Sequence, residues 1–242
     1  MSEAALYRLA MVGGVLCGAA VWAWLRSRRD PAMPAIGGRR MAWLGLCAVG
    51  GAALGAKLAF LVAEGWRYSD DTLALLSGQS ITGALLGGYA GVEIGKRAIG
   101  HRGPTGDWFA IGVPLGIALG RLGCHARGCC AGVALDRQHA LACVDAGGVH
   151  RWPAQTVELV FNLGCALLAA VATQRGWFPG NRLHLYFIAY GLFRATHELA
   201  RTTAPLLETP LGPVTGYTFI ALGLALFGAV RFAQRRRELA TP

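Results

Sequence analysis

The stretch from which both fold and chemistry of this chain can be read is Gly120-Arg121-Leu122-Gly123-Cys124-His125-Ala126-Arg127-Gly128-Cys129-Cys130-Ala131-Gly132. It follows an apolar run over residues 109–119, so we expect it to begin where a membrane-spanning helix reaches the surface. The glycines allow tight turns and a close approach of the backbone to a ligand. The arginines suit phosphate, and the thiols can act as nucleophiles, metal ligands or a redox pair. A glycine-rich loop closed by a disulfide is the alternative interpretation.

The composition indicates an all-α, polytopic integral membrane protein that forms one transmembrane domain over residues 1–242. Of its 242 residues 54% are hydrophobic and only 15% are charged, whereas a soluble domain carries about 25% charged residues. Apolar runs of about twenty residues recur along the chain, as membrane-spanning helices require. We predict seven such helices, at residues 5–25, 41–62, 73–99, 108–122, 156–173, 183–200 and 211–232.

The placement of the basic residues explains the net charge of +10 better than a nucleic-acid partner does. With seven spans, one side of the membrane receives residues 26–40, 96–106, 174–182 and the tail from 231, which together hold 14 of the 23 basic residues. By the positive-inside rule this side is the cytoplasm. We therefore predict an extracytoplasmic N-terminus and a cytoplasmic C-terminus.

The longest external loop, residues 123–155, is predicted to form a small extracytoplasmic head. It carries four cysteines and three histidines, namely Cys124, Cys129, Cys130, Cys143, His125, His139 and His150. In an oxidising compartment a disulfide could join Cys129 or Cys130 to Cys143. The same groups could hold zinc, but their spacing does not match paired C-x₂-C ligands, and we predict neither a metal nor another cofactor.

Glycines at four-residue spacing mark two helices as packing surfaces. Gly83, Gly87, Gly91 and Gly95 fall on one helix face, and Gly51 and Gly55 on another. Such bare faces let a neighbouring helix lie directly against the backbone. We interpret the stripe from residue 83 to 95 as a helix-packing face, with a lipid chain as the alternative occupant.

The predicted helix at residues 183–200 carries a second group of polar side chains. By three- and four-residue steps, one helical face receives Tyr190, Arg194, His197, Glu198 and Arg201. Arg194 lies eleven residues past the helix start, about 16 Å along the axis and hence near the membrane midplane. Ionisable residues at that depth mark function in most membrane proteins. The alternative is an Arg194–Glu198 pair that only holds helices together.

Four stretches within residues 77–220 resemble motifs of the prolipoprotein diacylglyceryl transferase family, in the family's order. Gly120-Arg121-Leu122-Gly123, followed by Gly128 and Gly132, resembles G-R-[IL]-G-N-F-x-N-G-E. Pro153-Ala154-Gln155 with Glu158 resembles P-S-Q-x-x-E. Tyr190-Gly191 with Arg194, Glu198 and Arg201 resembles Y-G-x-x-R-x-x-x-E-x-x-R, and Gly78-Gln79-Ser80-Ile81-Thr82-Gly83 resembles the region around S-F-H-G-G.

The chain also departs from the family pattern at four positions. The family's histidine falls on Thr82, its first signature asparagine on Cys124, its second on Arg127, and its signature glutamate on Cys129. The arginines and the carboxylates of Glu158 and Glu198 are therefore retained, while polar groups beside the reacting centre become thiols.

The resemblance implies a membrane transferase that moves a diacylglyceryl group from phosphatidylglycerol to the thiol of a lipoprotein, a small thiol or another acceptor. It places the chain in the bacterial inner membrane, with the reaction at the outer leaflet. The expected catalytic residues are Arg121, Cys124, Cys129, Arg194 and Glu198. The expected substrate-binding residues are Thr82, Gln155, Glu158, Tyr190, His197 and Arg201.

Each of these groups has a chemical role in such a reaction. The arginines would bind the departing phosphate, and a carboxylate, His125 or His197 would serve as base. Cys124 or Cys129 could act as a nucleophile. Two other functions remain open on the same residues: a membrane thiol oxidoreductase that uses the cysteines between 124 and 143, and a non-catalytic lipid-binding or transport protein.

Overall fold

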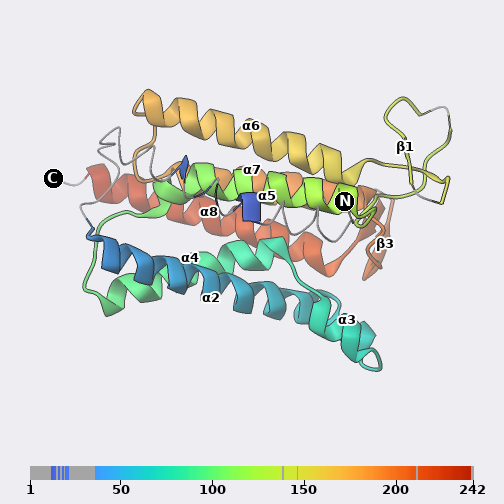
Figure 1. Ribbon diagram of the computed structural model, residues 1–242, viewed down its shortest axis with the longest axis horizontal. Helices are drawn as coiled ribbons and strands as arrows, with labels where there is room; N and C mark the ends of the chain where they lie inside the picture. The colour runs from blue at the N-terminus through green and yellow to red at the C-terminus, as the bar shows by residue number, and fades with distance from the viewer. Residues whose placement is uncertain are drawn as a thin grey trace. The chain divides into compact units, whose positions relative to one another are not determined.

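The computed structural model describes residues 12–14, 16, 18, 20–21, 36–137, 139–145, 147–210 and 212–240, and most of these are helical (Figure 1). The chain divides into two compact units. Unit 1 contains Thr105–Tyr186, Ala200–Thr202 and the described residues before 34. Unit 2 contains Pro34–Pro104, Phe187–Leu199 and Thr203–Pro242. The predicted first span, residues 5–25, lies almost entirely outside the described residues.

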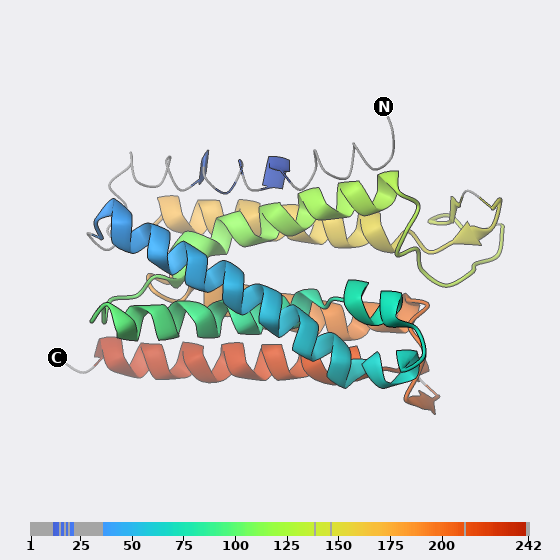
Figure 2. The ribbon, with the colours of Figure 1, turned by 60° about the horizontal axis from the view of Figure 1, so that its bottom comes forward.

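Unit 2 is built on three long helices, α2 (Gly38–Ala63), α4 (Ile81–Ala98) and α8 (Gly216–Ala240). Helix α2 crosses α4 at an angle, and α8 lies beside α4 (Figure 2). The shorter elements are η1 (Gly65–Tyr68), α3 (Thr72–Ser77), β3 (Leu207–Thr209) and β4 (Gly212–Val214). The two strands pair antiparallel, with Leu207 opposite Val214.

The glycine stripe of α4 packs against α2, which confirms the packing interpretation. A Cβ atom on Gly87 would come within 2.2 Å of the Gly51 carbonyl oxygen, and one on Gly91 within 2.1 Å of the Cys47 carbonyl oxygen. Likewise, a Cβ on Gly55 would meet the Gly83 carbonyl oxygen at 2.4 Å. Only glycine permits this backbone-to-backbone contact.

The predicted helix at residues 73–99 is interrupted, because two side chains begin two separate helices. Asp71 accepts a hydrogen bond from the Ala74 amide and caps α3. Ser80 accepts one from the Gly83 amide and caps α4. Lys57 donates hydrogen bonds to the carbonyl oxygens of Leu75 and Gly78, which lie at the end of α3 and just after it.

Unit 1 is built on α5 (Phe109–Ala126) and α6 (Ala154–Gln174), which lie side by side (Figure 1). The connection between them contains the short strands β1 (Cys143–Val144) and β2 (His150–Arg151), and η2 (Gly106–Trp108) precedes α5. The buried carboxylate of Asp107 accepts hydrogen bonds from the amides of Gly180 at 2.7 Å and Arg182 at 3.0 Å. It therefore ties the start of α5 to the start of α7 (Arg182–His197).

The predicted helix at residues 183–200 ends early. Helix α7 (Arg182–His197) begins in unit 1, continues in unit 2 and passes into one turn of 3₁₀ helix, η3 (Glu198–Ala200). Arg201 lies beyond it, in a β-bridge with Gly132. The predicted helix at 211–232 begins only at Gly216, because residues 212–214 form a strand.

Among the described residues, four helices are long and apolar enough to cross a membrane: Gly38–Ala63, Phe109–Ala126, Ala154–Gln174 and Gly216–Glu238. Many of their large apolar side chains are exposed, including Leu46, Val49, Leu167 and Leu168. In a soluble protein such surfaces would be a liability, whereas lipid tails cover them at no cost.

Candidate functional site

Arg121 lies inside α5, more than one turn before the last residue of the helix. The predicted helix, residues 108–122, had placed it next to the helix end. The helix continues to Ala126, so Cys124 and His125 belong to its last turn. Arg121 is buried, with 6% of its surface exposed. A buried guanidinium needs a partner, because an isolated charge away from water costs several kcal/mol.

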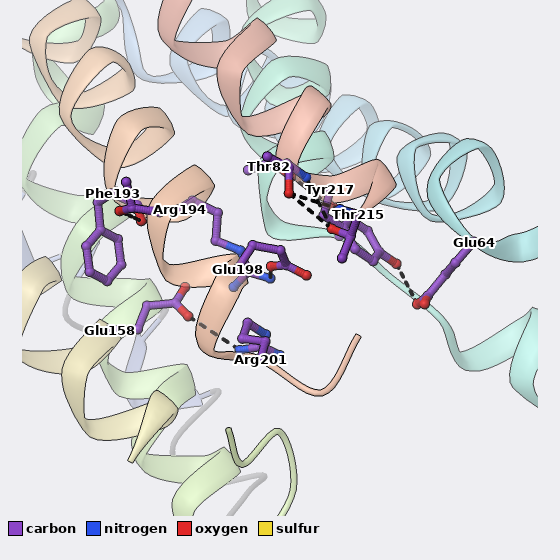
Figure 3. Close-up of polar contacts among 12 residues, drawn as sticks. Glu64, Thr82, Glu158, Phe193, Arg194, Glu198, Arg201, Thr215 and Tyr217 are labelled. Carbon is purple, nitrogen blue, oxygen red and sulfur yellow. Dashed lines mark hydrogen bonds and ion pairs between the residues drawn. The ribbon is translucent and has the colours of Figure 1, made fainter. Parts of the chain in front are cut away.

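That partner is Glu158 on α6. Nη2 of Arg121 lies 2.8 Å from Oε2 of Glu158, and Nη1 of Arg201 lies 3.9 Å from the same oxygen (Figure 3 shows the Arg201 contact). Glu158 is completely buried. Three residues that the sequence predicted to act together therefore meet in unit 1, where two guanidiniums share one carboxylate. The trio carries more positive than negative charge, as a site for an anion does.

Arg201 reaches this site through the loop that follows α5. The Val133 amide donates to the Ala200 carbonyl oxygen at 3.0 Å, and the Gly132 amide donates to the Trp152 carbonyl oxygen at 3.0 Å. A Cβ atom on Gly132 would meet the Ala200 oxygen at 2.6 Å. Gly132 of the signature stretch is thus required for the close approach that brings Arg201 to Glu158.

Gln155, predicted to bind substrate, holds the cysteine loop. Its Nε2 donates to the Cys129 carbonyl oxygen at 2.6 Å. One turn deeper than Glu158 on α6, buried Asn162 donates to the Glu158 carbonyl oxygen at 2.8 Å and accepts from Tyr186 Oη at 2.8 Å. Sequence reasoning missed Asn162, although its four-residue spacing from Glu158 in an apolar helix was a usable signal.

Three thiols gather where α5 ends. The Sγ atoms of Cys124, Cys129 and Cys130 all lie within 4.8 Å of one another. The Cys129 amide donates to the Cys124 carbonyl oxygen, the Gly128 amide donates to the His125 carbonyl oxygen, and Gly128 has φ +62°. These are the bonds of a Schellman helix end, which folds the sixth residue back over the first. Arg121 adjoins the thiols, with Nη1 3.9 Å from Cys124 Sγ.

The surroundings shift the pKa values of the thiols in opposite directions. A hydrogen bond from Cys124 and the guanidiniums of Arg201 and Arg121 lower the pKa of Cys130 to about 5, against the effect of burial. Burial and the neighbouring Cys130 charge raise the pKa of Cys129. These contacts favour the thiolate at Cys130 over one at Cys129, whereas the sequence suggested Cys124 or Cys129 as the nucleophile.

No disulfide joins any of the six cysteines in the described ranges: Cys47, Cys124, Cys129, Cys130, Cys143 and Cys165 are free. The suggested bridge to Cys143 is therefore not formed. Instead, Cys143 Sγ donates to the Arg151 carbonyl oxygen at 3.5 Å.

Unit 2 contains the second predicted group. Nη2 of Arg194 lies 2.7 Å from Oε2 of Glu198, and Glu198 is completely buried (Figure 3). Tyr190 and His197 are also buried, and the His197 ring stacks on Phe193 with 5.0 Å between centroids. Arg194 and Glu198 thus form the ion pair that the alternative interpretation of the sequence expected, in which the pair holds helices together.

Thr82, at the position of the family's histidine, is also buried in unit 2. Its hydroxyl lies 2.8 Å from that of Ser80. A further, half-buried contact, in which Tyr217 Oη donates to Glu64 at 2.8 Å, lies in the same unit and was not predicted (Figure 3). Glu64 follows α2 directly and Tyr217 begins α8, so no local spacing signals their contact.

Apolar helices of membrane-spanning length with buried arginine–carboxylate groups define the class of integral membrane proteins. The family model for prolipoprotein diacylglyceryl transferase matches residues 2–231. The chain belongs to this family and is a transferase.

Individual relatives agree with the family model. The chain is 30% identical over 185 residues to a phosphatidylglycerol–prolipoprotein diacylglyceryl transferase of Geobacter sulfurreducens, covering 74% of this chain and 71% of the relative. It is 29% identical over 177 residues to the protein of the same name from Dehalococcoides mccartyi, covering 69% and 68%.

Proposed function

We propose that this protein transfers a diacylglyceryl group from phosphatidylglycerol to a thiol at the outer leaflet of the bacterial inner membrane. The observation that carries the proposal is the buried Arg121–Glu158–Arg201 trio, in which one carboxylate fixes two guanidiniums. The relatives' names contain the same lipid donor and a prolipoprotein acceptor.

The Arg121–Glu158–Arg201 trio suits the chemistry of this transfer. The leaving group is a glycerol phosphate, which gains negative charge as its bond to the glyceryl carbon breaks. Guanidiniums that are already held in place stabilise this charge without reorganising during the reaction. The role of Glu158 is to position both guanidiniums, while Gln155 holds the adjacent loop.

Arg194 and Glu198 are further catalytic residues in this proposal, because they match the family motif that also includes Arg201. Tyr190, His197 and Thr82 would bind the lipid or the acceptor.

Cys124 and Cys129 complete the proposed catalytic set. Arg121 contacts the Cys124 sulfur, so a phosphate bound by Arg121 would lie near the thiols. We propose that seven helices span the membrane with the N-terminus outside, which directs the cysteine loop to the outer surface.

The test is lipid transfer by the purified protein in liposomes. Labelled phosphatidylglycerol and a cysteine-containing lipobox peptide are supplied, and lipidated peptide and released glycerol phosphate are measured. We expect equal amounts of both products. Arg121→Lys should lower the rate about 10²–10³-fold, because lysine keeps the charge but loses the two-pronged geometry.

Arg182→Lys is the matched control. Arg182, the first residue of α7, is also buried in unit 1 and pairs with Asp107 at 3.4 Å. Asp107 lies just before α5, roughly 20 Å along the helix axis from Arg121. The Arg182→Lys variant should keep most of the activity. No peptide lipidation by the parent protein, or equal losses in both variants, would reject the proposal; lipid-independent thiol oxidation would favour the oxidoreductase instead.

A further inference from the structure

The thiol cluster at the end of α5 has a geometry that the sequence pattern did not indicate. The spacing C-x₄-C-C lacks the paired C-x₂-C ligands typical of structural zinc sites. The Schellman turn nevertheless brings Cys124 and Cys129 together, because it joins the first and sixth residues of the helix end. Cys130, with φ +63°, then turns its own Sγ to within 4.8 Å of the other two.

The backbone around the cluster is held in place. Gln155 binds the Cys129 carbonyl oxygen at 2.6 Å, and the Cys129 amide binds the Cys124 carbonyl oxygen at 3.1 Å. The loop that follows is tied at Gly132 to Trp152. A left-handed backbone at a cysteine is uncommon and persists only where the surroundings hold it. A ligand would therefore meet a site that is already largely formed.

The sulfur positions fit a tetrahedral metal ion. A Zn–S bond is about 2.3 Å long, so two sulfurs on one ion lie about 3.8 Å apart. The Sγ atoms of the three cysteines are at most 4.8 Å apart, so each separation needs to shorten by about 1 Å or less to reach this value. Adjustment of the cysteine side chains supplies a movement of that size.

The charges around the cluster also fit. Three thiolates and a divalent ion together carry one negative charge, and the Arg121 guanidinium lies 3.9 Å from Cys124 Sγ to balance it. Such outer partners orient metal ligands and tune their basicity. A disulfide would involve two of the three sulfurs, and a catalytic nucleophile would involve a single sulfur. A metal site with three thiolate ligands and one open position involves all three.

We propose that Cys124, Cys129 and Cys130 bind a thiophilic metal ion of the Zn²⁺ type, and that its fourth position receives the acceptor thiol of the transfer reaction. The second part rests on the proposed function. Zn²⁺ suits this role because it accepts three protein ligands with one open position and has no redox chemistry.

Binding at the fourth position prepares the acceptor for attack. A thiol that coordinates such an ion loses its proton to water and stays a thiolate. Its sulfur forms a bond to the glyceryl carbon of phosphatidylglycerol, and the bond from that carbon to the phosphate oxygen breaks. The electron pair leaves on the glycerol phosphate, where Arg121 lies close by, and no oxidant or reductant takes part.

Metal binding is measured on the whole protein in detergent, reduced and freed of metal by a chelator. Titration with Zn²⁺ against a chromophoric chelator should give one ion per chain. Serine at Cys124, Cys129 or Cys130 should weaken Zn²⁺ binding by about 100-fold or more. The matched controls Cys143→Ser and Cys165→Ser should bind within about twofold of the parent, and each variant's thermal unfolding midpoint checks its fold.

The acceptor position is probed with Cd²⁺, whose thiolate complexes absorb in the ultraviolet. A cysteine peptide should increase this absorption, whereas the same peptide with serine should not. Undiminished Zn²⁺ binding by the triple serine variant would overturn the metal site. A disulfide within the cluster that persists after treatment with the reductant would overturn it as well. A peptide without spectral effect would overturn the acceptor position.

Lipid transfer separates this proposal from the proposed function. Transfer that continues at the full rate in the triple serine variant would overturn the metal's role and the catalytic role of Cys124 and Cys129, and would leave the transferase itself standing. Stoichiometric Zn²⁺ binding without any transfer by the parent protein would overturn the acceptor role together with the proposed function, and leave the metal site itself standing.

Discussion

At the scale of single residues, the functional region of unit 1 depends on one carboxylate. Glu158 is completely buried and lies within 4 Å of guanidinium nitrogens from both Arg121 and Arg201. Two buried positive charges would repel each other and lack solvation if that carboxylate were neutral. Glu158 therefore contributes to stability as well as to the geometry of the site.

Glu158→Gln keeps the shape of the side chain and removes its charge. We expect this variant to lose about 3–5 kcal/mol of stability, because a buried pair has been broken on one side only. The measurement is the unfolding midpoint in detergent. Replacing Arg121 and Glu158 together by leucine should cost less than Glu158→Gln alone, and an unchanged midpoint in Glu158→Gln would contradict this account.

Asp145 in the external loop offers a pH-dependent prediction. A hydrogen bond from Arg151 and the amides of Val149 and Gly147 lower the pKa of the Asp145 carboxyl. A lowered folded-state pKa stabilises the loop above the ordinary pKa, and this stability is lost as the pH falls through the folded value. The loop should therefore stay ordered from neutral pH down to about 4 and open below that.

Hydrogen exchange of residues 143–151 measures this opening. Asp145→Asn should exchange a few-fold faster than the parent at neutral pH, and the difference should vanish once the pH is low enough to protonate the parent carboxyl as well. Asp136→Asn, an exposed change in the same loop, is the control and should leave the exchange unchanged. Equal exchange of parent and Asp145→Asn at neutral pH would refute the role of this carboxylate.

At the scale of elements, unit 2 depends on the contact between α2 and α4. The glycines remove side chains from both surfaces, so the backbones touch. Dispersion contacts of this kind are what hold helices together in lipid, where burial of apolar surface gains nothing.

Gly87→Ala should push the two helices apart, because its Cβ would lie 2.2 Å from the Gly51 carbonyl oxygen and 2.8 Å from the Gly55 Cα. We expect a loss of about 1–3 kcal/mol, measured as a lower unfolding midpoint in detergent. Gly45→Ala on α2 is the matched control, because its Cβ would meet nothing within 4 Å. Equal midpoints for both variants would show that the close contact is not needed.

At the scale of the whole molecule, the distribution of basic residues predicts the orientation in the membrane. Reporter fusions at residues 35 and 135 should lie on opposite sides, with 135 outside. Two fusions on the same side would reject the seven-helix topology, whereas 35 outside and 135 inside would reject its orientation.

A double-mutant cycle tests whether Arg121 and Arg194 contribute to the same step of the proposed transfer. The activities of Arg121→Lys, Arg194→Lys and the combined variant are compared with the parent. If both residues stabilise the same phosphate, their effects should deviate from additivity by about 0.5–3 kcal/mol. Strict additivity would indicate independent roles for Arg121 and Arg194.

The class of this protein and most of the residues in its polar groups could be predicted from the amino-acid sequence. Composition and the length of the apolar runs depend on the membrane as solvent, so they indicate spanning helices without any knowledge of contacts. The glycine spacing in α4 and the four-residue pairing of Arg194 with Glu198 are local, and both were predictable for that reason. The family motifs likewise identified Arg121, Glu158 and Arg201.

Only the tertiary structure decided which of these groups meet and where the helices end. Arg121, Glu158 and Arg201 come from three separate segments, and their contact depends on the bridge between Gly132 and Arg201. The end of α5 and the break before α4 depend on capping bonds, which compete with an otherwise continuous apolar pattern. The thiol cluster likewise required the fold, because a turn of the backbone, and not the spacing of zinc motifs, brings its three sulfurs together.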